Sequence, residues 1–182
     1  KDAGFANIPV ISFNVVGMEK MPGFKITPDM VEKLLKVVVY GDLLQKMLTK
    51  NRVYEVNKGE TQKLYDEWMQ KCKELVVHSS LSEFKKSIYD MVNDFEKIEL
   101  DTSMKKPKVG IVGEVLIKYH PFGNNFIAEK LEQEGAEVIL PDFMGFVKFM
   151  ATHKITFNTL IKTDKYKAKI FKLAIKLIDI LE

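Results

Sequence analysis

Cysteine is nearly absent from this sequence, which contains a single one, Cys72. One cysteine makes neither an internal disulfide nor the ligand set of an iron–sulfur cluster. The chain therefore fits a reducing compartment, and we expect a cytoplasmic protein. Because Cys72 shares an apolar helical stripe with Trp68 and Leu75, we interpret it as a small buried hydrophobic residue rather than a nucleophile.

An excess of one charge sign and long apolar runs are missing too. The net charge is only +3, and basic and acidic residues are interspersed, so we expect no nucleic-acid partner. No apolar run reaches the roughly 18 residues of a membrane span, and no secretory signal opens the chain. The histidines, His78, His120 and His153, lie far apart in the sequence, so no metal site is predicted.

Standard nucleotide-binding motifs are not present. A phosphate-binding P-loop needs Gly-Lys-Ser/Thr after its glycines, and the glycine-containing stretch at 110–113 lacks it. A dinucleotide fingerprint needs three spaced glycines, whereas only Gly110 and Gly113 fall near the expected turn. A nucleotide-binding βαβ domain therefore ranks third among the functions considered.

Residues 1–26 predict the end of a preceding α/β lobe. The first four residues are typical of a last helical turn closed by Gly4, and residues 8–16 form a β-branched run that predicts a strand. The chain starts without methionine and stops within an amphipathic pattern. We therefore expect a fragment of a larger protein.

Residues 27–106 predict an all-helical segment followed by a charged linker. Thr27 and Pro28 are typical of a helix start, and we expect this helix to reach about Asn51 with its apolar centre enclosed. Gly41 interrupts that centre at a cost of about 1 kcal/mol relative to alanine. A close helix crossing or a break would explain the glycine.

Two further helices are expected in this segment, over residues 60–77 and 81–98. Ser80 and Glu83 form a capping box at the start of the second of them.

Residues 107–182 predict a truncated, Rossmann-like βαβ lobe. A buried apolar strand is expected at 108–113, a loop at 114–123, a helix at 124–134 ended by Gly135, and a second strand at 136–140. The two strands should be parallel. Helices are expected at 142–150 and 165–181, so the predicted fold class is α/β, a Rossmann-like lobe plus an all-helical segment.

The predicted ligand site is the loop that follows the first of these strands. In open parallel sheets, ligands bind beyond the carboxyl ends of the strands, where helix N-termini point. The candidate ligand-binding residues lie on that edge: Gly113, Glu114, Tyr119, Pro121, Asn124, Asn125 and Asp142. No residue is assigned a catalytic role.

Each of these residues also has a structural interpretation. Glu114 is either an acid/base or ligand acceptor, or a cap for amides of its own loop. Asn124 and Asn125 either contact a ligand or cap the next helix, where amides left free would bind an anion or a carbonyl. Tyr119 and His120 either contact a ligand or pack over the loop.

Several short segments of the sequence resemble one protein family. The main ones are Lys108-Val109-Gly110-Ile111-Val112-Gly113-Glu114-Val115, Tyr119-His120-Pro121-Phe122-Gly123-Asn124-Asn125 and Pro141-Asp142. Upstream, Tyr40-Gly41-Asp42-Leu43-Leu44 and Arg52-Val53-Tyr54-Glu55 with Gly59 continue the likeness. Together they resemble the long CoA-substrate-specific enzyme activases, which are related to the components of 2-hydroxyacyl-CoA dehydratases.

The resemblance implies the middle, dehydratase-like part of a larger anaerobic protein. Such a parent protein is expected to use ATP and a 4Fe-4S-type cluster to drive electron transfer towards a CoA-thioester substrate. This fragment is expected to hold no cofactor and no metal and to be inactive alone. Its expected partners are the activase ATPase part or dehydratase subunits.

Two functions of different kinds follow. The first is a dehydratase-like lobe that presents the loop after the first strand to a cluster or substrate cleft. The alternative is a non-catalytic docking or scaffold module, in which the helices of residues 27–98 receive an activase partner.

Overall fold

The computed structural model describes residues 27–161 and, near the C-terminus, residues 172, 173, 175, 176 and 179. The elements in chain order are α1 (Pro28–Arg52), α2 (Glu60–His78), α3 (Leu81–Glu96), β1 (Lys108–Gly110), α4 (Val115–Tyr119), α5 (Ile127–Gln133), β2 (Glu137–Ile139) and α6 (Phe143–Leu160). The expected strand at 8–16 and most of the expected helix at 165–181 lie outside the described residues.

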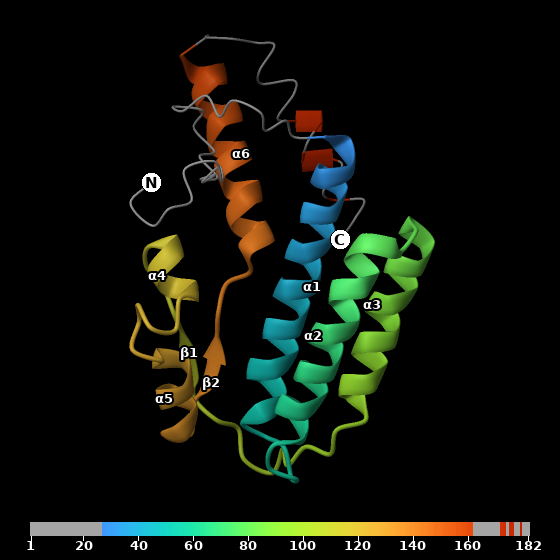
Figure 1. The fold of residues 1–182 in the computed structure, drawn as a ribbon. Helices are drawn as coiled ribbons and strands as arrows, with labels where there is room; N and C mark the ends of the chain where they lie inside the picture. The colour runs from blue at the N-terminus through green and yellow to red at the C-terminus, as the bar shows by residue number, and fades with distance from the viewer. Residues whose placement is uncertain (1–26, 162–171, 174, 177–178, 180–182) are drawn as a thin grey trace, which may run out of the picture.

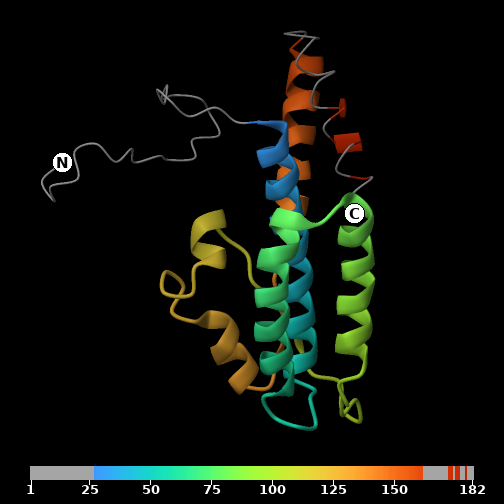
Figure 2. The same cartoon turned by 45° about the vertical axis from the view of Figure 1, so that its right-hand side comes forward.

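Helix α1 is shared by two groups of elements. Helices α1, α2 and α3 lie side by side, while α4, α5 and the strands lie on the side of α1 away from α3 (Figure 1 and Figure 2). Helix α1 contacts α2 and α3 in the first group, and β2 and α6 in the second. The helical segment and the βαβ unit therefore pack against a common helix.

The strands β1 and β2 are parallel, with Val109 paired to Val138. The prediction of a parallel βαβ unit is thus confirmed. In the part of the chain that the structure describes, the sheet has two strands and helices predominate. The class α/β therefore holds at this coarse level.

The first strand is less buried than its apolar sequence predicts. Lys108 and Gly110 are exposed, and Val112 just beyond them is 85% exposed. Helices α1 and α5 both pack on β2, where Val138 is buried. The expectation of a buried first strand is wrong, because its covering elements lie over the second strand.

The hydrophobic core lies between α1, α2 and α3. It contains Tyr40, Leu44, Trp68, Cys72, Phe84, Met91, Phe95 and Ile98. The ring of Tyr40 meets Phe84 edge to face at a centroid distance of 5.0 Å, and its hydroxyl shares a 2.5 Å hydrogen bond with Ser87. Burial raises the pKa of the Cys72 thiol to about 12, so the interpretation of Cys72 as a buried hydrophobic residue is confirmed.

The apolar centre of α1 is only partly enclosed. Tyr40 is buried, as expected, but Val37 is 50% exposed. The sequence predicted an enclosed centre because it is apolar nearly all round. Val37 remains on a strip of α1 that its neighbouring elements do not cover.

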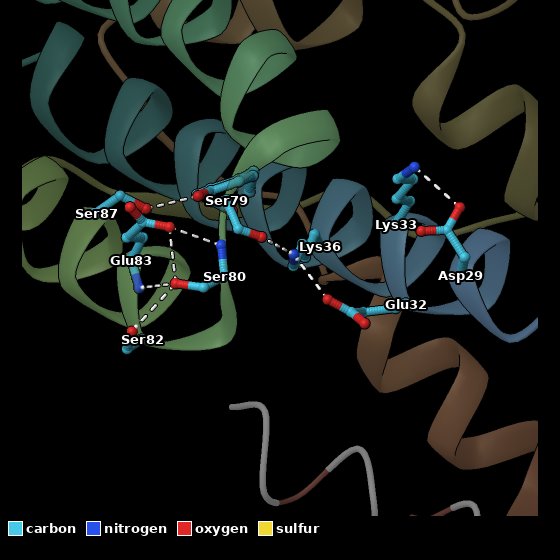
Figure 3. A network of polar contacts seen from close by, with 10 residues as sticks. Asp29, Glu32, Lys33, Lys36, Ser79, Ser80, Ser82, Glu83 and Ser87 are labelled. Carbon is cyan, nitrogen blue, oxygen red and sulfur yellow. Dashed lines mark hydrogen bonds and ion pairs between the residues drawn. The ribbon is translucent and has the colours of Figure 1, made fainter.

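Two of the expected helix starts are confirmed by their caps. Thr27 Oγ1 accepts a hydrogen bond from the Met30 amide at 3.2 Å. At the start of α3, the Ser80 amide donates to Glu83 Oε2 at 2.7 Å and the Glu83 amide donates to Ser80 Oγ at 3.3 Å, which completes the capping box (Figure 3).

Lys36 joins α1 to the end of α2. Its ammonium group donates to the Ser79 carbonyl at 2.7 Å and forms an ion pair with Glu32 at 2.8 Å (Figure 3). The side chain is buried. A cation at a helix C-terminus opposes the negative end of the helix dipole, so Lys36 stabilises the turn between α2 and α3.

The residues that follow α1 join it to the βαβ unit. Arg52 forms an ion pair with Glu132 of α5 at 2.7 Å. The Tyr54 hydroxyl donates to Glu137 of β2 at 3.0 Å. These two contacts hold the end of α5 and the start of β2 against the helical segment.

Glu55, from the same stretch, caps the start of α2. Its buried carboxylate accepts hydrogen bonds from the Gly59 and Thr61 amides, both at 2.8 Å. Burial opposes ionisation of Glu55, but hydrogen bonding from Gly59 and Thr61, with the charge of Lys58 nearby, outweighs it and lowers the pKa of the carboxyl. Glu55 is therefore charged at neutral pH, and each of its oxygens accepts an amide hydrogen bond.

In the part of the chain described, no helix combines the length and apolar character needed to span a bilayer.

Replacing Glu55 with glutamine should lower the free energy of unfolding by about 1–3 kcal/mol at neutral pH, because one amide loses its charged acceptor. A lowered folded-state pKa gives stability that is present above the unfolded pKa, about 4.3, and is lost as the pH falls through the folded value. The gap between wild type and Glu55→Gln should therefore narrow in acid.

Urea denaturation at neutral and acidic pH measures this gap. Glu67→Gln, at an exposed carboxylate of α2, is the control and should leave stability unchanged. A gap that stays constant with pH would contradict the capping role.

Candidate ligand-binding site

A cavity of about 440 Å³ lies at the carboxyl edge of the sheet, between α1, α4 and the start of α6. It is lined by Gly41, Asp42, Gln45, Val115, Leu116, Tyr119, His120, Leu140, Pro141, Asp142 and Phe143. Its volume falls within the range of about 300–1,000 Å³ that small-molecule sites occupy. From here on, this space is called the sheet-edge cavity.

Two carboxylates hold the start of α6. Asp42, from the middle of α1, accepts hydrogen bonds from the Phe143 and Met144 amides, both at 2.8 Å. Asp142 accepts the Gly145 amide at 2.5 Å. The first three amides of α6 are thus bonded to carboxylates of the chain itself.

The glycine at position 145 is needed for this arrangement. A Cβ built there would overlap Asp142 Oδ1. The two carboxylates also offset the positive end of the α6 dipole. The α6 side of the sheet-edge cavity is therefore acidic and does not favour a phosphate.

Tyr119 lies on the opposite wall, in α4. Its hydroxyl donates a short hydrogen bond to the Pro141 carbonyl, and its ring meets Phe143 at a centroid distance of 6.0 Å. Burial, with further contributions from Asp42 and Asp142, raises the pKa of Tyr119 to about 12. Tyr119 thus remains a neutral hydroxyl whose oxygen can still accept a hydrogen bond.

His120 follows Tyr119 and also lines the cavity. Its Nδ1 accepts a hydrogen bond from the Gly123 amide at 3.1 Å. An accepting Nδ1 carries no proton, so in this hydrogen-bond arrangement the ring proton lies on Nε2. His120 therefore offers one hydrogen-bond donor, suited to a carbonyl oxygen.

The segment expected to be a loop at 114–123 contains helix α4, which is a correction to the sequence-based prediction. Glu114 is its N-cap and accepts the Ile117 amide at 3.0 Å. Of the two interpretations of Glu114, the structure shows the capping contact.

Asn124 holds the same segment together. Its side-chain amide donates to the Ile117 carbonyl at 3.1 Å and to the Lys118 carbonyl at 3.0 Å. Its Oδ1 accepts the Ile127 amide at 3.3 Å, at the start of α5. Its hydrogen-bonding groups are thus used within the chain.

The remaining predicted residues lie outside the lining of the sheet-edge cavity. Gly113 has a φ of +145°, a value that favours glycine. The Pro121 carbonyl accepts the Phe126 amide at 2.8 Å. Asn125 and Phe126 have φ values of 59° and 54°, which places a bulky aromatic residue in a strained backbone conformation.

Of the seven predicted ligand-binding residues, the cavity thus brings together Tyr119 and Asp142. It adds Gly41 and Asp42, which lie far upstream and were not among the predicted site residues. Their signal in the sequence was a Gly-Asp pair inside an otherwise apolar helix centre. That pair marked an unusual position, but nothing in the sequence indicated that it lies opposite Asp142.

A metal centre does not fit the described residues. They contain no group of three or more histidine, cysteine or acidic side chains placed to hold a metal ion. The thiol of Cys72 is buried in the core of the helical segment and is protonated. In the part of the chain that the structure describes, the residues therefore do not offer a ligand set for the iron–sulfur cluster expected of the parent protein.

Replacing Asp42 with asparagine should destabilise the protein by about 1–2 kcal/mol, because the two amides lose a charged acceptor. Hydrogen exchange at Phe143 and Met144 should accelerate, since the start of α6 is then held less firmly to α1. Urea denaturation and exchange measured by NMR test this. Asp90→Asn, at an exposed carboxylate of α3, is the control and should change neither quantity. If the Phe143 and Met144 amides exchange at the same rate in Asp42→Asn as in the wild type, Asp42 does not hold the start of α6 to α1.

No protein-family model, no curated protein and no solved structure matches this chain.

Proposed function

We propose that this chain is the Rossmann-like, dehydratase-like lobe of an ATP-driven iron–sulfur electron-transfer protein that acts on CoA thioesters. One observation carries the proposal. Three segments that bear the family resemblance, far apart in sequence, line the sheet-edge cavity, and they contribute Gly41 and Asp42, Tyr119 and His120, and Pro141 and Asp142. The position beyond the carboxyl ends of parallel strands is where such folds bind ligands.

The proposed role of the cavity is to hold the thioester end of the substrate. The Nε2–H of His120 donates to the thioester carbonyl, and the Tyr119 oxygen accepts from a substrate hydroxyl. Apolar lining residues such as Leu116 and Phe143 receive the acyl group. The nucleotide end of CoA stays outside, because its phosphates would face Asp42 and Asp142.

The other components belong to the parent protein. ATP and the cluster are held by the activase part or by dehydratase subunits in a cytoplasmic, anaerobic setting. The chain alone binds but does not turn over its ligand.

The test is calorimetric titration of the chain with acetyl-CoA and with free CoA. Acetyl-CoA should bind and CoA should bind more weakly, since it lacks the carbonyl. His120→Ala should weaken acetyl-CoA binding by about five- to tenfold, the usual effect of one lost hydrogen bond.

His153→Ala is the matched control, since His153 is exposed on α6 and stacks between Phe149 and Phe157. It should leave the affinity unchanged. Equal binding of acetyl-CoA and CoA, or no effect of His120→Ala, would count against a thioester site.

A second candidate function, docking of an activase partner, is favoured by a different observation. Val31, Leu34 and Val37 recur every three residues along α1 and are 44%, 52% and 50% exposed. Residues at this spacing share one helix face, so they form an exposed apolar stripe. Under this alternative, the ATPase part of the activase covers the stripe.

Leu34→Lys should weaken association with the purified activase part by at least about tenfold, because a charge would enter the apolar interface. Sedimentation velocity with and without ATP measures this. Leu160→Lys, at an exposed leucine of α6, is the control. Association that is equally strong in Leu34→Lys would exclude the stripe as the docking surface.

A further inference from the structure

Gly41 has no packing reason to be glycine. Helix α1 runs unbroken through it, from Pro28 to Arg52. A Cβ added at Gly41 would meet nothing within 4 Å. Neither a helix break nor a close crossing therefore explains a residue that destabilises a helix interior relative to alanine.

A second cavity, of about 380 Å³, lies between α1 and α2. Its lining residues are Val37, Tyr40, Gly41, Leu44, Met69, Cys72, Lys73 and Val76. Gly41 is thus shared with the sheet-edge cavity. Gly41 is exposed and carries no side chain, so position 41 itself places no side chain between the two spaces.

The two cavities differ in chemistry. The sheet-edge cavity contains the polar groups of His120, Tyr119 and Gln45. The second cavity is apolar apart from Lys73 and Tyr40, and the Tyr40 hydroxyl is already bonded to Ser87. A ligand that fills both needs a polar end and an apolar end.

We propose that Gly41 is a specificity-determining residue that lets a linear acyl chain pass from the sheet-edge cavity into the cavity between α1 and α2. This inference rests on the proposed function, because the thioester end of the ligand occupies the site described above. The glycine then selects for chain length, since a larger side chain at position 41 would fill the passage. Each methylene buried in the second cavity should raise the affinity roughly two- to fourfold.

The occupant is a flexible aliphatic chain rather than a polar molecule. The second cavity offers no polar group that is both unpaired and buried: the thiol of Cys72 is protonated, and Lys73 is exposed. Burying a polar ligand group there without a partner would be unfavourable.

The experiment compares the affinities of acetyl-CoA and decanoyl-CoA, the latter kept below its micelle concentration. The variants are Gly41→Leu and Val37→Lys, which alter the passage and the second cavity. The matched control is Val56→Lys, since Val56 is 48% exposed and Val37 is 50% exposed, and Val56 lines neither cavity.

The wild type and Val56→Lys should bind decanoyl-CoA at least about 100-fold more tightly than acetyl-CoA. Val37→Lys should reduce that preference at least about tenfold and leave acetyl-CoA binding unchanged. Gly41→Leu should abolish the preference. Gly41→Leu should also raise the urea midpoint, because leucine favours the helix, and a raised midpoint excludes misfolding as the cause.

Four results would overturn the inference. Acetyl-CoA binding without any chain-length preference, or a preference that survives both variants, removes the acyl passage and leaves the proposed function intact. If neither acetyl-CoA nor decanoyl-CoA binds, the inference and the proposed function both fail. If Val37→Lys left decanoyl-CoA binding unchanged but abolished association with the activase part, the second cavity would belong to a docking surface, which also overturns the inference.

Discussion

The hydrogen bonds from the Phe143 and Met144 amides to Asp42 fix the carboxyl edge of the sheet against α1. They join residues about 100 positions apart, and the sheet-edge cavity lies where these segments meet. Asp42 adjoins the apolar centre of α1, where a charged side chain without partners would be unfavourable. A carboxylate bonded to two helix-start amides offsets that cost, since it satisfies amides that would otherwise lack partners inside the fold.

The residues that follow α1 make a second set of contacts between α1 and the elements around it. Arg52 and Tyr54 bind carboxylates of α5 and β2, and Glu55 binds the amides that start α2. Helix α1 and the turn after it thus hold the βαβ unit at two levels, near Asp42 and near Arg52. The strained backbone at Asn125 and Phe126 lies between α4 and α5, outside the lining of the sheet-edge cavity.

The sequence predicted the local elements better than the site. Thr27, Ser80 with Glu83, and Gly135 act through neighbours a few residues away, so their roles could be recognised from spacing alone. Glu114 and Asn124 also act locally: Glu114 is the N-cap of α4, and Asn124 accepts the first amide of α5, whose N-cap residue is Phe126. Asp42 could not be assigned, because its partners lie a hundred residues away and periodicity does not report distant pairing. Val37 was expected to be enclosed, since an apolar sequence does not show which side of a helix its neighbours leave uncovered.

The central claim is that the sheet-edge cavity receives a thioester. A crystal structure of the chain with acetyl-CoA tests it most directly. The account predicts density for the thioester between His120 and Asp142, with its carbonyl oxygen within hydrogen-bond distance of His120 Nε2 and the nucleotide outside. An ordered acetyl-CoA bound elsewhere on the chain, with the cavity between α1 and α4 empty, would contradict it.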